Sequence, residues 1–326
     1  QFHLDSGRDN HMYIHLTLIP FLHASQEIKT KPTQQSVGKL REIGILPDIL
    51  ICRTEVSLGD DVRRKISLFC NVPVEAVIEE KDVDFSVYQI PQMLAEQKVD
   101  ELIVRRLGLT SRKPDLTRWN AMVEAFRHPE AEITIAVVGK YLDLNDAYKS
   151  IWESITHAAI ANRCKVKIKK VPAEDVETQG LAKFMDGVSG ILVPGGFGNR
   201  GIEGKIKAAQ YARECNVPYY GLCLGMQIAC IEFARNVAGL EKANSMEFDE
   251  HTPHPVIHLM ERQKGVTEKG GTMRLGAYPC RITPGSIAAR CYGKDLVQER
   301  HRHRFEFNNA YRDLFAQKGL RFSGIW

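Results

Sequence analysis

Apolar positions along the chain fall into two successive series of strand-like and helix-like segments. Alternating apolar residues predict strands, and apolar residues at three- and four-residue spacing predict helices. The first series predicts, in order, a strand at 12–19, a helix at 35–43, a strand at 48–52, and helices at 62–70 and 90–97, with Pro73 and an acidic loop at 79–84 between these two helices. The first three elements predict a β-α-β unit.

The second series begins after a segment of different composition. Residues 107–132 contain Gly108, the run Ser-Arg-Lys-Pro at 111–114 and mixed charges, and they predict an interdomain linker with a short helix around 119–126. The elements predicted beyond it are strands at 133–138, 165–171, 190–193 and 218–222 and helices at 147–161, 202–215 and 224–238. This alternation is typical of an α/β protein with mostly parallel sheets and helices on both faces. We therefore predict two doubly wound domains, over 1–106 and 133–326.

Composition narrows the classes of protein to consider. At 326 residues with 44% hydrophobic residues, the chain can bury two ordinary cores. A net charge of +4 calls for neither a nucleic acid nor a membrane as a partner. The eight cysteines form no Cys-x-x-Cys pair, which predicts reduced thiols and a cytoplasmic location. No apolar run is long enough to span a bilayer, and the first residues do not resemble a signal peptide.

Gly221-Leu222-Cys223-Leu224-Gly225 places a cysteine between two glycines, where an apolar strand is predicted to meet an apolar helix. A side chain on such a turn projects clear of the sheet, with free backbone N–H groups beside it. The partial positive charge at the helix start is expected to favour the reactive thiolate. The alternative is a buried structural cysteine, the commoner fate of this residue type. The strand-to-helix context favours Cys223 as a nucleophile.

A glycine-rich turn, Pro194-Gly195-Gly196-Phe197-Gly198, follows another predicted strand directly. Ligands of parallel α/β folds bind beyond the carboxyl ends of the strands, so this turn and Cys223 can share one crevice. Backbone N–H groups of Gly195, Gly196 and Leu224 are then placed to stabilise the oxyanion of an acyl transfer. Taken alone, the turn would simply use glycine for a positive φ.

These two motifs resemble those of class I, triad-type glutamine amidotransferases, in VPGGFGNRG at 193–201 and GLCLGMQ at 221–227. Four further motifs narrow the resemblance to CTP synthases: KTKPTQ at 29–34, GKYLDLNDAYKS at 139–150, GGTMRLG at 270–276 and ERHRHRFE at 299–306. The resemblance runs from Gln1 to the C-terminus. It implies an ammonia-dependent, ATP-driven amidoligase domain joined to a glutaminase domain, which convert UTP, ATP and L-glutamine into CTP, ADP, phosphate and glutamate.

The resemblance implies a role for each residue of the glutaminase site. Cys223 would attack the side-chain amide of glutamine, giving a γ-glutamyl thioester and ammonia. Gly196 would line the pocket together with Leu224, Gly225, Met226 and Gln227. Glu247 would bind the α-amino end and Arg304 the α-carboxylate, which suits a zwitterion because guanidinium grips a carboxylate in bidentate fashion. Taken alone, Glu247 would be an ordinary surface carboxylate.

The alternating run at 300–304 has its own interpretation from the residues. Its period of two predicts a strand with Arg300, Arg302 and Arg304 on one face. It lacks the interleaved aromatic residues of a nucleic-acid surface. His301 and His303 belong to the glutamine-carboxylate motif of the resembled family, so neither is expected to be the catalytic base.

In the first domain the resemblance implies nucleotide sites. A site for UTP or CTP is implied at Lys29, Thr30, Lys31, Pro32, Thr33, Gln34 and Lys65, and contacts to ATP at Lys81, Asp82 and Val83. Taken alone, Lys29 and Lys31 would be solvated lysines in a polar turn. The family also implies Mg²⁺ with ligands outside these residues, GTP as an allosteric activator, CTP as a feedback inhibitor and a homotetramer.

The chain departs from the family pattern in three places. The phosphate-binding loop Gly-x-x-x-x-Gly-Lys-[Ser/Thr] and the magnesium carboxylates would precede Gln1, and Gly38-Lys39 and Gly139-Lys140 are not such loops. The His-Pro-Glu segment that completes the triad would follow Trp326, and the stretch at 259–270 is short for the family. Since the sequence also lacks an initiator methionine, we expect a piece of a longer protein or one with stretches omitted, with little turnover by these residues alone.

Two other classes of function stay open at this point. A stand-alone cysteine hydrolase, such as a γ-glutamyl hydrolase, would have the same cysteine turn without needing the KTKPTQ motif or the preceding β-α-β unit. A catalytically silent assembly module would leave Cys223 unreactive and its pocket closed. Binding of UTP or CTP distinguishes the first class, and labelling with a glutamine-like electrophile distinguishes the second.

Overall fold

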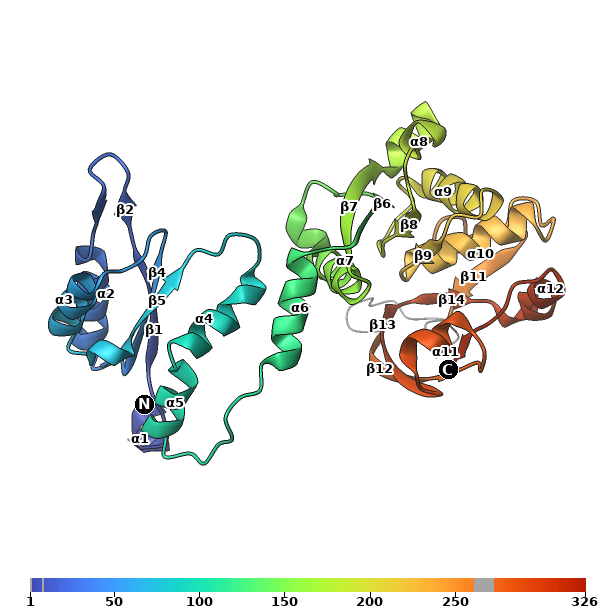
Figure 1. Cartoon of the computed structure of the whole chain (residues 1–326). Coiled ribbons are helices and arrows are strands. Elements are labelled where there is room, and N and C mark those ends of the chain that lie inside the picture. The colour runs from blue at the N-terminus through green and yellow to red at the C-terminus, as the bar shows by residue number, and fades with distance from the viewer. Residues whose placement is uncertain (1, 8, 261–272) are drawn as a thin grey trace. The chain divides into compact units, whose positions relative to one another are not determined.

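The computed structural model describes residues 2–7, 9–260 and 273–326, and the chain divides into two compact units, Gln1–His128 and Pro129–Trp326 (Figure 1). Both units are built on parallel strands with helices packed against them. The predicted α/β class is therefore confirmed. The short stretch at 259–270 and the first residues of the motif at 270–276 lie largely outside the described residues.

The first unit contains a three-stranded parallel sheet in the order β1-β4-β5. A two-stranded hairpin, β2-β3, is inserted between β1 and the first long helix. The elements are α1 (Phe2–Ser6), β1 (Ile14–Ile19), β2 (Phe21–Leu22), β3 (Glu27–Ile28), α2 (Lys31–Glu42), β4 (Ile49–Thr54), α3 (Asp60–Cys70), β5 (Val77–Lys81), α4 (Ile90–Glu96), α5 (Val99–Arg106) and α6 (Thr117–Arg127), with single 3-10 turns at Val74–Ala76 and Val87–Gln89.

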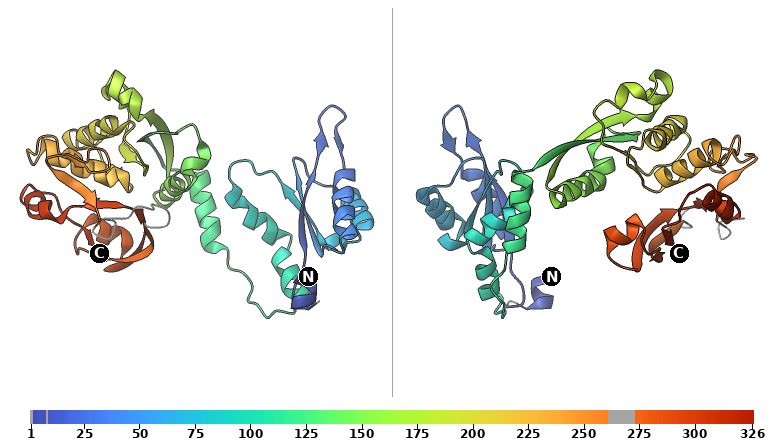
Figure 2. Two further views of the ribbon diagram at one scale, coloured as in Figure 1. Left: turned by 180° about the vertical axis from the view of Figure 1, so that it is seen from behind. Right: turned by 45° about the vertical axis from the view of Figure 1, so that its right-hand side comes forward.

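The core of this unit lies around β4, where Leu50 and Cys52 are fully buried and pack with Val37 of α2 and Ile66 of α3. Figures 1 and 2 show α2 and α3 against one side of the sheet and α4 and α5 on the other. The backbone N–H of Asp82 donates to the carbonyl of Thr54 at 2.8 Å, so the carboxyl ends of β4 and β5 lie side by side. This edge of the sheet is where ligands of parallel folds bind.

The prediction of an acidic loop at 79–84 was wrong in part, because β5 continues to Lys81. The strand forms although it contains two carboxylates, since Val77 and Ile78 are buried and the whole strand pairs with β4. The Glu79 carboxylate accepts hydrogen bonds from the backbone N–H of Leu58 at 2.7 Å and from Arg63 at 3.3 Å. Charge alone was therefore a poor loop signal here.

Helix α2 begins at Lys31, four residues before the predicted start. Pro32 stands in the first turn of the helix, where its fixed φ suits helical backbone and its missing N–H loses no hydrogen bond within the helix. The expected polar turn therefore ends at Thr30. Consequently Lys31, Thr33 and Gln34 belong to the first turn of a helix.

The segment expected as a linker contains α6, which packs within the first unit. Trp119 Nε1 donates to the backbone carbonyl of Tyr88 at 2.8 Å, and Phe126 lies 5.7 Å from Phe85, centroid to centroid. Residues 109–116 before it form neither helix nor strand. The division between the compact units falls after His128, three residues before the next strand begins.

The second unit contains a four-stranded parallel sheet in the order β7-β6-β8-β9. Two smaller sheets follow, in the orders β10-β11-β14 and β13-β12-β15. The elements are β6 (Ala131–Gly139), α7 (Lys149–Ala161), β7 (Cys164–Pro172), α8 (Ala173–Gln179), β8 (Gly190–Val193), α9 (Ile202–Glu214), β9 (Tyr219–Gly221), α10 (Leu224–Asn236), β10 (Asn244–Ser245), β11 (Pro255–Leu259), β12 (Arg274–Ile282), α11 (Ile287–Tyr292), β13 (Leu296–His303), β14 (Phe305–Phe307), α12 (Arg312–Gln317) and β15 (Gly324–Ile325), with 3-10 turns at Asn145–Tyr148, Ala182–Phe184 and Asn309–Tyr311.

Helices cover both faces of the four-stranded sheet, as the doubly wound prediction requires. On one face, Val137 and Leu192 pack against side chains of α7 such as Trp152. On the other, Ala136, Val138, Ile191 and Val193 form a core with residues of α8 and α9. The predicted strands and helices from 133 to 238 appear with boundaries shifted by at most two residues.

The strand predicted at 300–304 is part of β13, and the prediction was wrong at its last residue. Arg300 and Arg302 are exposed on one face of β13, but the strand ends at His303. Arg304 is the single residue between β13 and β14, which pair with strands of different sheets. The chain therefore turns from one sheet to another at Arg304.

Candidate active site

The turn at Cys223 is a strained strand-to-helix junction. Cys223 has φ 51° and ψ −100°, in a region that side chains other than glycine rarely adopt. It lies between the end of β9 and the first residue of α10. Strain of this kind costs free energy and persists where the surrounding structure holds it, which is typical of an active site.

The two glycines of the turn allow the close approach that holds it. A Cβ at Gly225 would lie 2.2 Å from the carbonyl oxygen of Val193, and one at Gly221 would lie 2.3 Å from the carbonyl carbon of Gly225. Neither position can accept a side chain without moving backbone. The spacing Gly-x-Cys-x-Gly is thus what lets α10 begin directly against β8 and β9.

The glycine-rich loop 194–198 lies beside the cysteine, because β8 and β9 are neighbours and Val193 pairs with Gly221. A Cβ at Gly195 would lie 3.5 Å from the Cβ of Cys223, and one at Gly196 would lie 3.6 Å from the Leu224 side chain. Lys140, at the end of β6, donates from Nζ to the carbonyl of Phe197 and ties the loop down. The two candidate motifs therefore share one crevice.

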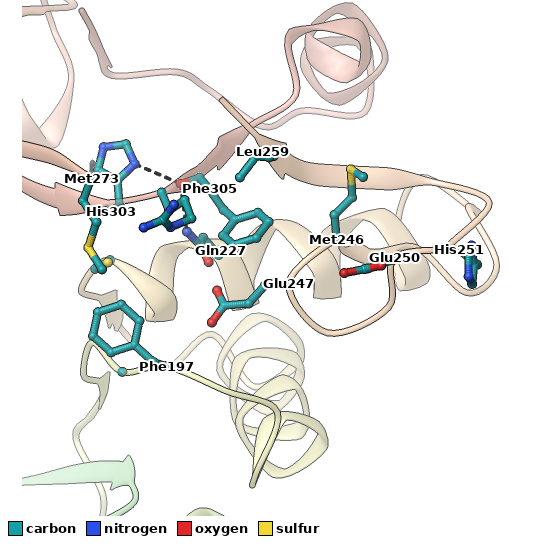
Figure 3. Close-up of a pocket in the computed structure, with 13 residues that line it drawn as sticks. Phe197, Gln227, Met246, Glu247, Glu250, His251, Leu259, Met273, His303 and Phe305 are labelled. Atoms are coloured by element: carbon teal, nitrogen blue, oxygen red, sulfur yellow. Dashed lines mark hydrogen bonds between the residues drawn. The ribbon is translucent and has the colours of Figure 1, made fainter. Parts of the chain in front are cut away.

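A cavity of about 520 Å³ opens in front of Cys223 (Figure 3). Its volume is within the range of small-molecule sites. It is lined by Gly196, Phe197, Cys223, Gln227, Met246, Glu247, Glu250, His251, Leu259, Met273, His303, Arg304 and Phe305. Of the residues predicted for glutamine, the structure brings Gly196, Cys223, Gln227, Glu247 and Arg304 to this cavity.

The polar walls of the cavity are held by hydrogen bonds. Glu247 Oε1 accepts from the backbone N–H of Gly198 at 3.1 Å, which fixes the carboxylate on the Phe197 side of the cavity (Figure 3). Buried Gln227 donates from Nε2 to the carbonyl of Phe305 at 3.3 Å. A carboxylate and a guanidinium, Glu247 and Arg304, thus line one cavity, as recognition of an amino-acid zwitterion requires.

Three further residues predicted for the glutaminase site, Leu224, Gly225 and Met226, belong to the first turn of α10 and do not line the cavity. Leu224 and Gly225 are buried in the first turn of α10, where Leu224 is 1% exposed. Met226 is 43% exposed and points its sulfur toward Cys230, with Sγ to Sδ at 3.7 Å. We find no role for the Met226 side chain in the cavity.

The pKa of the Cys223 thiol lies above its ordinary value, which corrects the expectation that the helix start favours the thiolate. Desolvation of the sulfur by the surrounding protein is the main cause, although the residue as a whole is exposed to solvent, and the charge of Glu247 adds to it. The hydrogen bond from the Leu224 backbone N–H lowers the pKa but does not outweigh burial. Cys223 Sγ donates to the carbonyl of Arg302 at 3.8 Å, as a protonated thiol does. Attack by this sulfur therefore needs a base.

His303 cannot be that base in the observed geometry. Its Nδ1 lies 2.9 Å from the carbonyl oxygen of Phe305, so Nδ1 carries the proton and donates. Its Nε2 lies 2.8 Å from Nδ1 of His301 and is engaged as well. Both ring nitrogens of His303 are thus occupied away from the thiol.

Most of the candidate nucleotide residues of the first unit lie on its surface, and Lys81 and Asp82 stand at the carboxyl edge of its sheet. Lys29 follows the β2-β3 hairpin and pairs with Glu27 at 2.5 Å, while Lys31 is exposed at the start of α2. Lys81 ends β5, and Asp82 after it pairs with Arg53 at 2.8 Å. Val83 is half-buried in the loop that follows, and Lys65 is exposed in the middle of α3.

Two of these residues are buried and hold the helix start. The Thr33 hydroxyl lies 2.9 Å from that of Thr17 of β1, and Thr33 is fully buried. Thr30, 5% exposed, accepts a hydrogen bond from Gln34 Nε2 at 3.1 Å. The Thr33 hydroxyl therefore anchors α2 to the sheet, while the Thr30 hydroxyl engages the Gln34 side chain within the helix start.

Several residues of the cavity were missed from the sequence. Phe197, Met273, His303 and Phe305 stand inside motifs that were recognised, but they received no role as cavity residues. Met246, Glu250, His251 and Leu259 reach the cavity from loops and strands after α10, for which no elements were predicted. The one signal available in the sequence was that several of them are close neighbours of Glu247 or Arg304.

Other features of the described residues bear on the class of protein. All eight cysteines are free thiols. Within residues 2–7, 9–260 and 273–326, no group of three or more His, Cys, Asp and Glu side chains is arranged to hold a metal ion. Among the helices of the described part of the chain, none is long and apolar enough to cross a membrane.

Comparison with known families gives two matches. Residues 1–109 match the family described as CTP synthase N-terminus, and residues 143–325 match glutamine amidotransferase class-I. The second match covers β7, β8 and β9 of the four-stranded sheet and all of the cavity residues.

Relatives and a solved structure agree with these matches. The chain is 56% identical over 325 residues to a CTP synthase of Caldanaerobacter subterraneus and 51% identical over 327 residues to one of Geotalea uraniireducens. All of this chain is covered in both alignments, but it spans only 60% and 61% of those relatives. The glutaminase domain of Trypanosoma brucei CTPS with bound acivicin is 42% identical, with a TM-score of 0.55 over 59% of this chain and 74% of that one.

Proposed function

Since the chain belongs to the CTP synthase family, with a class I glutamine amidotransferase domain at residues 143–325, we propose that its protein makes CTP from UTP. The reaction would use ATP and ammonia released from L-glutamine. One observation carries the proposal: Cys223 stands on a strained strand-to-helix turn in a cavity that Glu247 and Arg304 also line. The match of residues 1–109 to the CTP synthase N-terminus favours this over a stand-alone hydrolase.

Glutamine would lie in the cavity with its two charged ends recognised separately. Its α-ammonium would meet the carboxylate of Glu247, and its α-carboxylate would meet the guanidinium of Arg304. Both contacts are charge-assisted hydrogen bonds, which are stronger than neutral ones. Binding at both ends would direct the side-chain amide toward Cys223.

The chemical step would be acyl transfer to sulfur. Loss of the thiol proton to a base lets Sγ attack the amide carbon, and a carbon–sulfur bond forms while the carbonyl oxygen becomes an oxyanion. Backbone N–H groups of Leu224 and of the Gly195–Gly196 turn would stabilise that charge. The carbon–nitrogen bond then breaks, nitrogen takes up the proton, and ammonia leaves. Water hydrolyses the γ-glutamyl thioester to glutamate and restores the thiol.

The base in this scheme is proposed to be the histidine of the family's His-Pro-Glu segment. The raised pKa of Cys223 makes such a base necessary, because little thiolate is present at neutral pH without it. His303 is engaged with His301 and with the Phe305 carbonyl, and His301 does not line the cavity, so neither is assigned this role.

The first unit would bind the nucleotides. We propose that Lys29, Lys31, Gln34 and Lys65 contact UTP or CTP and that residues 81–83 contact ATP. The described residues offer no cluster that fits Mg²⁺, so no step is assigned to it here. Activation by GTP, inhibition by CTP and a tetrameric state are proposed from the family alone. Eight free thiols suit a reducing compartment, so we propose the cytoplasm.

Replacing Cys223 by serine tests this division of labour. We expect Cys223→Ser to abolish CTP formation with glutamine and to leave CTP formation from ammonium salts intact, because free ammonia bypasses the thioester. Steady-state assays with both nitrogen sources measure this. Equal loss with both sources would contradict the proposal that glutamine is hydrolysed at a separate site.

The silent assembly module makes a different prediction. A chloroketone analogue of L-glutamine should alkylate Cys223 one-to-one, and L-glutamine should protect against it, as intact and peptide mass spectrometry would show. Absence of labelling at Cys223, with labelling of the exposed Cys215 or Cys291 instead, would favour the silent module.

A further inference from the structure

The backbone turn around Arg304 is attached to the cysteine helix on both sides. On one side, the Arg302 carbonyl accepts from Cys223 Sγ at 3.8 Å. On the other, the Phe305 carbonyl accepts from Gln227 Nε2 at 3.3 Å. Cys223 and Gln227 lie one turn apart at the start of α10. The position of Arg304 relative to the cysteine is therefore set by the backbone from 302 to 305.

A chain of two histidines fixes the shape of this turn, and Figure 3 shows its second member, His303, bonded to the Phe305 carbonyl. A carbonyl only accepts, so His303 Nδ1 carries a proton and donates it to the Phe305 carbonyl, two residues on, at 2.9 Å. In neutral His303 the Nε2 atom is then an acceptor. His301 Nδ1 lies 2.8 Å from it and must donate. The tautomers of both rings follow from this one carbonyl.

The pair is enclosed by groups from three strands. Tyr278 of β12 packs edge-on against His301 with ring centroids 5.2 Å apart. Arg274 of β12, 12% exposed at its side chain, pairs with Glu306 of β14 at 3.4 Å and lies 4.1 Å over the ring of Trp326. Glu299 is the charged neighbour on β13 itself. Burial lowers the pKa of both histidines, and the charge of Arg274 lowers it further, so both rings are neutral at neutral pH.

We propose that His301 and His303 are a positioning pair for substrate recognition, which holds Arg304 at the α-carboxylate of glutamine through the 302–305 backbone. Neither histidine is a catalytic residue, since both ring nitrogens of His303 are engaged and His301 is not among the residues that line the cavity. The inference rests on the proposed binding of glutamine at Cys223. It adds to that function two residues whose role is to keep the guanidinium in register with the sulfur.

Equilibrium binding separates this role from catalysis. We would measure the Kd of L-glutamine by calorimetry in a Cys223→Ser background, where no turnover occurs. Adding His303→Ala removes both hydrogen bonds and should weaken binding about tenfold or more, because a misplaced guanidinium loses its bidentate geometry. Adding His301→Ala removes one link and should weaken it about threefold. Gln298→Ala, an exposed position on β13, is the matched control and should change nothing.

A conservative variant distinguishes positioning from bulk packing. The side-chain amide of His301→Asn places an N–H donor where Nδ1 stood, so it should restore the Kd to within about twofold of the background, although the ring that packs on Tyr278 is lost. If His301→Asn binds as weakly as His301→Ala, packing and not the hydrogen bond is responsible, and the proposal is wrong. Because His301→Asn and His301→Ala change the same position, their comparison does not depend on whether His303→Ala folds.

The outcomes also keep the two proposals apart. If Cys223→Ser itself binds no glutamine, the proposed function fails. If it binds and the histidine variants bind equally well, the function stands and the positioning pair is refuted. In the active enzyme, the same substitutions should raise KM for glutamine while kcat with glutamine and the KM for ammonia stay close to those of the parent.

Discussion

The two candidate sites of this protein are built in different ways. The cavity of the second unit is an assembled site, in which a strained cysteine, a loop tied down by Lys140 and a carboxylate fixed by Gly198 face one another. The residues of the first unit that we propose to contact nucleotides include three exposed lysines, Lys31, Lys65 and Lys81.

The two sites differ in what holds their functional groups in position. In the second unit, backbone atoms and neighbouring strands fix the positions, so the geometry is present without a ligand. In the first unit, long charged side chains at the carboxyl edge of a sheet depend on a ligand to order them. A lost glycine should therefore damage the cavity, whereas a lost lysine should affect only affinity.

The largest expected effect comes from a methyl group at the turn. Gly225→Ala puts a Cβ 2.2 Å from the Val193 carbonyl oxygen, and we expect it to destabilise the second unit by at least about 3 kcal/mol and to abolish glutamine hydrolysis. Gly38→Ala, in the middle of α2, meets no atom within 4 Å and should stabilise the first unit by roughly 0.5–1 kcal/mol. Urea unfolding of both variants measures this contrast. A stable, active Gly225→Ala protein would mean that the strand and helix can move apart.

The next effect concerns the lysines of the first unit. Lys29→Ala, Lys31→Ala and Lys65→Ala should each weaken UTP or CTP binding roughly tenfold to a hundredfold, since a charge-assisted hydrogen bond contributes about 1.5–3 kcal/mol. Thermal stability should stay unchanged, because all three substitutions are at the surface. Calorimetric titration with each nucleotide measures the Kd.

Two neighbours on α2 provide controls for the lysines. Lys39→Ala removes an exposed lysine that pairs with Glu42 in the last turn and should leave nucleotide binding unchanged. Thr33→Val removes the buried hydroxyl contact with Thr17 and should cost roughly 1 kcal/mol of stability with little direct effect on affinity. Unchanged Kd values for all three lysine variants would leave this surface without a nucleotide role.

A smaller effect is expected from substitution of Arg304 in the cavity wall. Arg304→Lys keeps the charge but loses the paired hydrogen bonds, so KM for glutamine should rise about tenfold while KM for ammonia does not change. Initial rates with each nitrogen source measure both constants. An unchanged KM for glutamine would remove Arg304 from the substrate site.

The smallest effect is a pH dependence of stability. Burial holds the pKa values of His301 and His303 below their ordinary value of 6.5, so the unfolded chain binds more protons than the folded one just below that pH. The free energy of unfolding should therefore rise with pH up to about 6.5 and then level off as far as these groups are concerned. Urea unfolding at several pH values, with His301→Asn for comparison, measures it. An identical slope in the variant would mean that His301 does not contribute.

The parts predicted from sequence are those that local pattern determines. The alternation of strands and helices and the Gly-x-Cys-x-Gly turn are properties of contiguous residues, and both appear as expected in β6 to α10. Helix α2 began early because Pro32 starts a helix as readily as it ends a turn. Strand β5 was taken for a loop because it contains two carboxylates, of which Glu79 finds its partner, Arg63, outside the strand.

The parts that were missed depend on long-range contacts. Met246, Leu259 and Phe305 reach the cavity because the small sheet β10-β11-β14 packs on α10, and short strands of two to five residues carry little periodicity. The raised pKa of Cys223 could not be predicted either. A helix start favours thiolate in any sequence, but burial of the sulfur and the approach of Glu247 are tertiary effects.

Because a single residue separates β13 from β14, this region restricts the insertions and deletions that the protein can accept during evolution. Phe305 and Phe307 pack into the core beside α10 while Glu306 between them faces the other way. Inserting or deleting one residue next to Arg304 would exchange these faces, burying a carboxylate and exposing two phenyl rings. Length variation should therefore be excluded from residues 301–307, even where individual side chains can be substituted.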